Sequence, residues 1–382
     1  MKRAGLMVLV LGLFFLAQIA QADWSTAKRL TWTSGASESP AIAIDSSDKL
    51  QVVWFDYAPG NWEIYYKRST DGGATWSAVK RLTWTSGDSF APAVAVDSSN
   101  SIHVVWYDNT PGHYEIYYRR SPDGGTTWGT VKRLTWTSGD SIFPAIAIDG
   151  NGTIHVVWDA NTSETDEIYY RKSPNGGTTW STAQRLTWTS GSSTTPAIAV
   201  DSGNTIQVVW GDDTSGNPEF YYKKSADGGA AWSPAQRLTW TSGKSYDAAI
   251  TIDSGGALLV VWSDDTPGNY EIYYKRSTDG GITWGAAKKL TSTSLESILP
   301  AIAIDSSNAI HVVWEDYTPG NPELYYKRSA DGGATWSALQ RLTWTSGDSA
   351  SPAIAIDSSG AIHVVWQDFT PGNYEIYYKE GK

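Results

Sequence analysis

The chain has no cysteine among its 382 residues, and it contains only two methionines and five histidines. The absence of cysteine excludes disulfides, thiol catalysis and cysteine-ligated zinc. Basic residues are also scarce, with 29 Lys and Arg against 40 Asp and Glu and no basic block. Nucleic acids and anionic membrane surfaces require clustered cations, so both are poor partners for this chain. No phosphate loop, catalytic triad or metal motif is present, and we expect neither a cofactor nor a metal.

The first 22 residues have the order of a secretory signal. Residues 1–3 are a short basic start, residues 4–17 are an unbroken apolar run, and residues 20–22 have the small-x-small form of a peptidase site. A membrane anchor is the weaker alternative, because a spanning helix needs about 20 apolar residues. We therefore expect a mature chain of residues 23–382 that is secreted or periplasmic and is not inserted in a membrane.

Aromatic residues are abundant, with 21 Trp and 21 Tyr, and we expect such rings to be buried. Most of the tryptophans follow a repeat of 52 residues. The Trp of a Val-Val-Trp motif gives Trp54, Trp106, Trp158, Trp210, Trp262, Trp314 and Trp366. A second series is Trp24, Trp76, Trp128, Trp180, Trp232, Trp284 and Trp336. A third is Trp32, Trp84, Trp136, Trp188, Trp240 and Trp344, with Ser292 at the remaining position.

Each repeat predicts four short β-strands, which in the second copy cover residues 93–96, 102–106, 115–120 and 132–136. Four strands repeated seven times predict an all-β, seven-bladed β-propeller of four-stranded antiparallel blades, forming one domain over residues 23–382. Residues 24–31 match a fourth strand, whereas the chain stops after a third strand. The N-terminal strand would therefore complete the last blade and close the ring. A linear solenoid is the alternative that these ends disfavour.

The turn between the third and fourth strands carries the motif Ser-x-Asp-x-Gly-x-Thr-Trp. It covers residues 69–76, 121–128, 173–180, 225–232, 277–284 and 329–336, with Asn175 and Ala231 as departures. The motif resembles the Asp-box, or BNR, repeat of sialidases and other secreted propellers. The resemblance implies that each Asp closes a hairpin turn and that each Trp packs between strands.

A sialidase of this kind would need three arginines around the substrate carboxylate, a Tyr nucleophile with a Glu partner, and an Asp acid. Such residues must be singular, because one pocket serves one substrate. Every arginine after the signal segment occupies a repeated position or one where other copies have Lys. Sialidases of the family usually have six blades, whereas this chain has seven copies. The sequence therefore disfavours sialidase chemistry.

The copies diverge on one face of the predicted ring, formed by the loops after the second and fourth strands. The candidate ligand-binding residues there are Tyr57, Trp62, Tyr107, Tyr114, Asp159, Asp166, Asp213, Tyr246, Asp247, Asp265, Tyr270, Glu315, Tyr317 and Tyr374. Exposed rings can stack on the C–H face of a pyranose, and carboxylates accept hydroxyl hydrogens. The alternative is that some rings wedge between blades as core.

The third and fifth copies are irregular, with Ala160 where the other copies have Asp and Ala248 where the other copies have Pro. A singular site is expected there. The repeated acids typified by Asp56 and Glu63, and the strand histidines typified by His103, are predicted to be structural.

The preferred hypothesis is a secreted, lectin-like propeller that binds a glycan through its variable face without catalysis. One alternative is a glycoside hydrolase that uses a carboxylate pair drawn from the acids outside the repeat, of which Asp159, Asp247 and Glu315 are the first to examine. Another is a structural or protein-binding module of the cell envelope.

Overall fold

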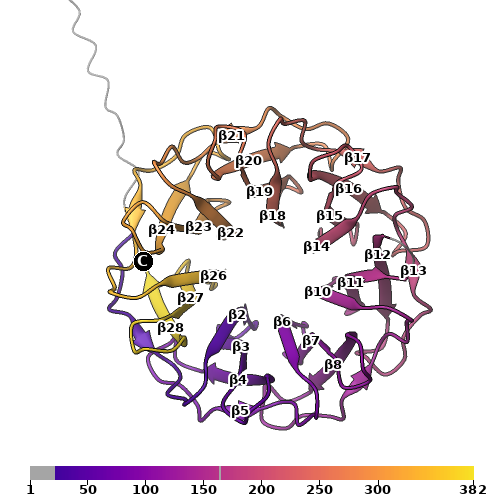
Figure 1. Ribbon diagram of the computed structural model, residues 1–382, viewed down its shortest axis with the longest axis vertical. Helices are drawn as coiled ribbons and strands as arrows, with labels where there is room; N and C mark the ends of the chain where they lie inside the picture. The colour runs from indigo at the N-terminus through magenta and orange to yellow at the C-terminus, as the bar shows by residue number, and fades with distance from the viewer. Residues whose placement is uncertain (1–21, 163–164) are drawn as a thin grey trace, which may run out of the picture.

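The computed structural model describes residues 22–162 and 165–382. They form seven four-stranded antiparallel sheets, arranged as blades around a central axis (Figure 1). Among the described residues no helix is long and apolar enough to cross a membrane. The predicted all-β, seven-bladed propeller is confirmed. The signal segment lies outside the described residues except for Ala22, and it stays a prediction.

The strands take four positions from the axis outward, and blade one begins at β2. The inner strands are β2 (Ser37–Ile44), β6 (Ser89–Val96), β10 (Ser141–Ile148), β14 (Ser193–Val200), β18 (Ser245–Ile252), β22 (Ser297–Ile304) and β26 (Ser349–Ile356). The second strands are β3 (Leu50–Asp56), β7 (Ile102–Asp108), β11 (Ile154–Asn161), β15 (Ile206–Asp212), β19 (Leu258–Asp264), β23 (Ile310–Asp316) and β27 (Ile362–Asp368).

The two outer positions complete each blade. The third strands are β4 (Glu63–Ser69), β8 (Glu115–Ser121), β12 (Asp166–Ser173), β16 (Glu219–Ser225), β20 (Glu271–Ser277), β24 (Glu323–Ser329) and β28 (Glu375–Gly381). The outer strands are β5 (Lys80–Arg81), β9 (Lys132–Arg133), β13 (Gln184–Arg185), β17 (Gln236–Arg237), β21 (Lys288–Lys289), β25 (Gln340–Arg341) and, for blade seven, β1 (Lys28–Arg29).

The core lies between neighbouring blades. Trp106 of β7 is buried against Val53, Ile64 and Tyr66 of blade one, and equivalent clusters recur at the other seams. Burial of one tryptophan removes about 150–250 Å² from water, worth roughly 4–6 kcal/mol of transfer free energy. Because each second strand is covered by blades on both sides, it is apolar on both faces rather than alternating.

The outer strands are shorter than predicted, and this expectation was wrong for residues 134–136. Leu134 still donates its N–H to the carbonyl oxygen of Ile116 at 2.7 Å. The next hydrogen bond of the ladder is accepted by a side chain. The Ile116 N–H donates to the Thr135 Oγ1 at 2.8 Å. The threonine hydroxyl thus replaces a backbone acceptor and ends the ladder.

The ring closes where the N-terminal β1 pairs with β28, with Lys28 opposite Tyr378 and Arg29 opposite Tyr377. Figure 1 shows the indigo N-terminal end beside the yellow C-terminal end in this blade. The Asp23 N–H also donates to the Lys382 carbonyl oxygen at 2.9 Å. The predicted completion of the last blade is confirmed, and it leaves β28 no free edge.

Candidate functional site

The Asp-box turns occupy one face of the ring, here called the box face. In the first box the Ser69 hydroxyl and the Thr75 N–H each donate to Asp71 Oδ1 at 2.8 Å. The bonds from Thr75 lower the pKa of Asp71 to about 2. Asn175 accepts the equivalent N–H of Thr179 at 2.9 Å. The turn-closing role implied by the resemblance is therefore present, and it does not require a carboxylate.

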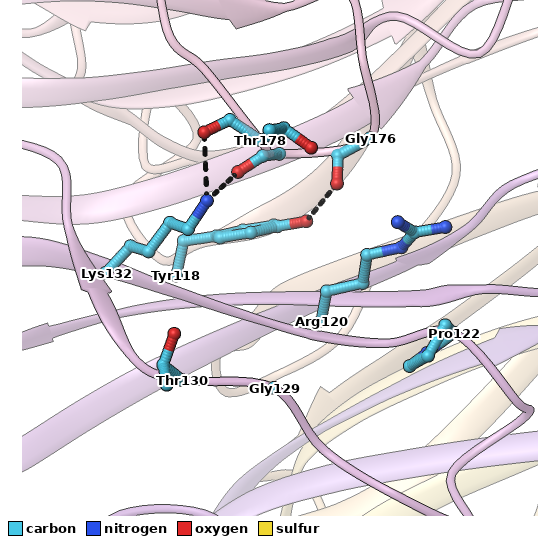
Figure 2. A pocket seen from close by; sticks show the side chains of 9 residues that line it. Tyr118, Arg120, Pro122, Gly129, Thr130, Lys132, Gly176 and Thr178 are labelled. Atoms are coloured by element: carbon cyan, nitrogen blue, oxygen red, sulfur yellow. Dashed lines mark hydrogen bonds between the residues drawn. The ribbon is translucent and has the colours of Figure 1, made fainter.

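The seams on the box face hold shallow pockets made from repeated residues. Figure 2 shows one of about 230 Å³, where Lys132 Nζ donates to the Thr178 carbonyl oxygen at 3.0 Å. The Tyr118 hydroxyl donates to the Gly176 carbonyl oxygen at 3.3 Å (Figure 2). These hydrogen bonds link blade two to blade three, and equivalent bonds recur in other blades. This pocket is therefore part of the framework.

The repeated acids and histidines are also structural. Glu63 is buried, pairs with Arg81 Nη2 at 2.7 Å and accepts the Thr85 N–H at 2.8 Å. Asp56 Oδ2 accepts the Ser37 hydroxyl at 2.6 Å, which ties the ends of two strands. The buried His103 contacts the Tyr118 hydroxyl at 2.8 Å. No cluster of His, Asp or Glu suited to a metal occurs within the described ranges.

The central mouth opens on the opposite, variable face. Each inner strand carries a bulge, and the bulged residue has a left-handed φ between 44° and 60°. These residues are Ser39, Ala91, Phe143, Thr195, Asp247, Leu299 and Ser351. Several of them line a cavity of about 340 Å³ together with the prolines that follow. Non-glycine residues rarely adopt this φ, so their repetition around one opening marks a strained and specifically built ring.

Side chains from the preceding blade hold several bulge N–H groups. Glu315 Oε2 accepts the Ser351 N–H at 2.9 Å, and Gln367 Oε1 accepts the Ser39 N–H at 2.7 Å. Asp159 Oδ1 accepts the Thr195 N–H at 3.3 Å. These three residues directly follow the Trp of the Val-Val-Trp motif, so the same sequence position supplies the cap of all three bulges.

Two of these caps are carboxyl groups buried without a cation. Burial raises the pKa of Glu315 to about 7, and the nearby charge of Asp247 adds to the rise. Burial also raises the pKa of Asp159 well above its usual range. Asp247 accepts the Ser263 hydroxyl at 2.9 Å, and burial raises its pKa too. Burial thus raises the pKa of all three acids, which come from the irregular copies and from blade six.

Blades one to three carry a continuous aromatic cluster on this face, made of Phe55, Tyr57, Trp62, Phe90, Tyr107, Tyr114 and Phe143. Its rings meet mainly edge to face, with centroids 5.0 Å apart for Phe55 and Trp62 and 5.1 Å for Tyr107 and Tyr114. Phe90 joins the two groups, at 5.2 Å from Phe55 and 5.8 Å from Tyr107. The rings pack mainly on one another, which agrees with the wedging alternative, but Tyr57 remains 45% exposed.

Blades five to seven carry separate rings beside acids. Tyr246, which is 40% exposed, packs on Tyr270 with centroids 6.1 Å apart. The Tyr317 hydroxyl donates to Glu315 Oε1 at 3.4 Å. Tyr374 packs edge to face on Phe369. This half of the face combines accessible rings with carboxyls whose pKa is raised by burial.

The other three predicted acids do not cap a bulge. Asp213 and Asp265 accept the N–H groups of Ser192 at 2.7 Å and Lys244 at 2.5 Å, so they clamp loops of adjacent blades. Asp166 begins β12, and its charge contributes to the raised pKa of Asp159. Sequence reasoning also expected the tryptophans to be buried, and this was wrong for the third series, whose six rings are exposed.

The arginines are engaged elsewhere. Arg29, Arg81, Arg133, Arg185, Arg237 and Arg341 pair with the repeated buried glutamates. Arg68, Arg120, Arg276 and Arg328 bond within or toward the box face. Arg119 and Arg171 contact exposed tryptophans. None of these arginines lines the cavity at the mouth, so that cavity lacks the three-arginine carboxylate site that a sialidase would need.

Residues 137–381 match the family model of BNR repeat-containing members, and residues 14–216 match the model of the BNR repeat-like domain. The chain belongs to the BNR repeat family.

Solved structures share its propeller fold at low identity. A protein of unknown function from Dyadobacter fermentans is 13% identical, with 93% of this chain and 99% of that chain covered and a TM-score of 0.58. An ulvan lyase, a polysaccharide lyase, is 12% identical, with 92% and 95% covered and a TM-score of 0.65. The intramolecular trans-sialidase of Ruminococcus gnavus is 12% identical, with 92% and 96% covered and a TM-score of 0.53. No curated protein sequence matches the chain significantly.

Proposed function

We propose that this protein is a secreted or periplasmic carbohydrate-binding propeller whose ligand lies on the variable face, beside the central mouth. The observation that carries the proposal is the combination, on blades five and six, of an exposed tyrosine ring with two carboxyls whose pKa is raised by burial. Tyr246 and Tyr317 lie on blades five and six, where Asp247 and Glu315 are also found. Several structural neighbours are named as carbohydrate-active proteins, which supports the ligand class.

The physical reasoning concerns how sugars are held. A tyrosine ring offers a flat apolar surface for the C–H face of a pyranose. A protonated carboxyl both donates and accepts a hydrogen bond, as a sugar hydroxyl requires. Because burial keeps the pKa of Glu315 near 7, the face near the mouth carries less negative charge than its acids imply.

A glycoside hydrolase is the second candidate, and one observation favours it. Asp247 and Glu315 are close enough for the charge of one to shift the other, and a carboxyl with a pKa of about 7 suits a general acid. The same experiment must therefore test for cleavage.

The test is a glycan array probed with the chain from Asp23 onward, followed by mass spectrometry of the retained sugars. We expect retention without cleavage. Tyr246→Ala should weaken binding roughly two- to tenfold, the worth of one ring contact. Ile282→Ala is the control, because Ile282 is also an exposed apolar side chain, at 68%, but lies in an Asp-box.

If the protein cleaves the sugars and Glu315→Gln abolishes the cleavage, the function is hydrolysis rather than binding alone. Absence of any sugar binding by folded protein would contradict both and favour a protein-binding or structural module.

A further inference from the structure

Six tryptophans at one repeated position leave most of their indole in solvent. They are Trp32, Trp84, Trp136, Trp188, Trp240 and Trp344, with exposed fractions between 65% and 69%. Each follows an outer strand by three residues, and Figure 1 shows the outer strands at the rim of the ring. Large apolar groups exposed in the same way six times are typical of interaction sites.

Each of these indoles lies beside two cations. Trp32 has the Arg29 guanidinium 5.6 Å from its ring centroid and the Lys67 ammonium at 5.5 Å. The first cation comes from the same blade and the second from the next blade. The distances in the other five copies lie between 5.4 and 5.9 Å. A cation at this distance from an indole is attracted to its face.

The two cations are held by fixed bonds. Arg29 pairs with the buried Glu375 at 2.7 Å, which neutralises it. Lys67 Nζ donates to the Leu30 carbonyl oxygen at 2.6 Å, across the seam between blades. No carboxylate among the described residues forms an ion pair with Lys67, and burial lowers its pKa. Each rim position therefore combines an accessible indole with one uncompensated positive charge, in a chain of net charge −11.

Blade five naturally lacks the tryptophan at this position. Ser292 stands where the other copies have Trp, and its surroundings keep both cations, Lys289 and Lys327. A cavity of about 400 Å³ lies at this position, lined also by Leu339 of the next blade. Lys327 still donates to the Leu290 carbonyl oxygen at 2.6 Å. The framework of the rim position thus forms without the indole, so the indole is not needed to build the seam.

We propose that the six rim positions are equivalent subsites for an acidic polysaccharide, a chain of pyranoses that carry carboxylate or sulfate groups. The indole stacks on a sugar ring, and the uncompensated cation attracts the anionic group. The subsites are spread around the circumference of a closed ring, because each follows an outer strand. A flexible polymer, or several chains of one polymer, can engage many and gain avidity.

These subsites share no residue with the proposed site at the variable face. The two can therefore be tested separately in one protein. The probes are native gels cast with polygalacturonate, with carrageenan or with neutral dextran, together with vesicles of phosphatidylglycerol and phosphatidylcholine.

The deciding variant changes all six exposed tryptophans to Ser, the residue that blade five already carries at this position. We expect at least one acidic polymer to retard the wild-type protein, dextran to have no effect, and the sixfold variant to lose the retardation. Ser292→Trp should add a seventh subsite and increase the retardation. Ile282→Ala should leave it unchanged, because Ile282 is 68% exposed, like the rim tryptophans, but lies in an Asp-box.

Lack of retardation by both acidic polymers would overturn the proposal, as would equal retardation of wild type and the sixfold variant. Retardation by dextran equal to that by the acidic polymers would overturn the acidic class of ligand. Vesicle binding that disappears in the sixfold variant would assign the rim to a membrane instead. Thermal unfolding of each variant confirms that loss of binding is not loss of fold.

Discussion

Replacement of Glu315 by Gln should stabilise the protein at neutral and alkaline pH and leave its stability unchanged near pH 4. Glu315 is 2% exposed, and its Oε2 accepts the Ser351 N–H. Gln367 occupies the same position in blade seven and makes the same bond to Ser39. The amide is therefore known to fit this site, and the substitution removes only the carboxylate charge.

The magnitude follows from the pKa. Burial raises the pKa of Glu315 from 4.5 to about 7. Between these values the folded state keeps its proton while the unfolded state loses it, so unfolding becomes easier as pH rises. The stability associated with the neutral carboxyl is full below about pH 4.5 and is lost as pH rises through 7. At about 1.4 kcal/mol per unit, the loss is roughly 3 kcal/mol.

Urea unfolding of both proteins from pH 4 to pH 9 measures this difference directly. The free energies of unfolding should coincide at pH 4 and separate by roughly 3 kcal/mol at pH 8, with the variant more stable. Gln367→Glu is the matched control, because it adds a carboxylate at the equivalent position and should show the opposite pH dependence. Parallel curves for wild type and Glu315→Gln would refute the argument that this carboxyl is held neutral by burial.

Three further predictions concern the framework. Phe90→Ala should lower the free energy of unfolding by about 2 kcal/mol in urea titrations, because Phe90 joins both groups of the aromatic cluster. Glu63→Ala should cost about 3 kcal/mol in the same assay, since it leaves Arg81 without its buried partner. Asp71→Asn should leave the melting temperature nearly unchanged, as Asn175 makes the same turn, whereas Asp71→Ala should lower it. If Asn and Ala behave alike at position 71, the Asp-box bonds are not stabilising.

Most of the fold could be predicted because the repeat fixes it. Trp54 and its six counterparts recur at one spacing, and the ends of the chain supply complementary parts of one blade. The strand lengths could not be predicted as well. Residues 134–136 have strand-forming side chains, but the Thr135 hydroxyl takes the bond that a backbone carbonyl would have made.

The candidate site was only partly predictable. Variation between copies singled out Asp159, Asp247 and Glu315, but the burial that raises their pKa values is not revealed by composition. The same variation also singled out Asp213 and Asp265, whose carboxylates clamp neighbouring loops. A variable acid in a turn can serve either purpose, and only its hydrogen-bond partners distinguish them.

If repeated residues are set aside in the search for a functional site, the site is assumed to occur only once. This assumption leads the exposed tryptophans at the rim to be overlooked. Trp84 recurs in every other blade but one, so repetition suggested a core residue, yet its ring is 65% exposed. For an enzyme the assumption holds, because one pocket serves one substrate. For a protein that binds a polymer it fails, because repeated weak sites are the means of tight binding. Ser292 distinguishes a core role from a binding role for the repeated tryptophan, since a core tryptophan could not be replaced by Ser without collapse of the seam.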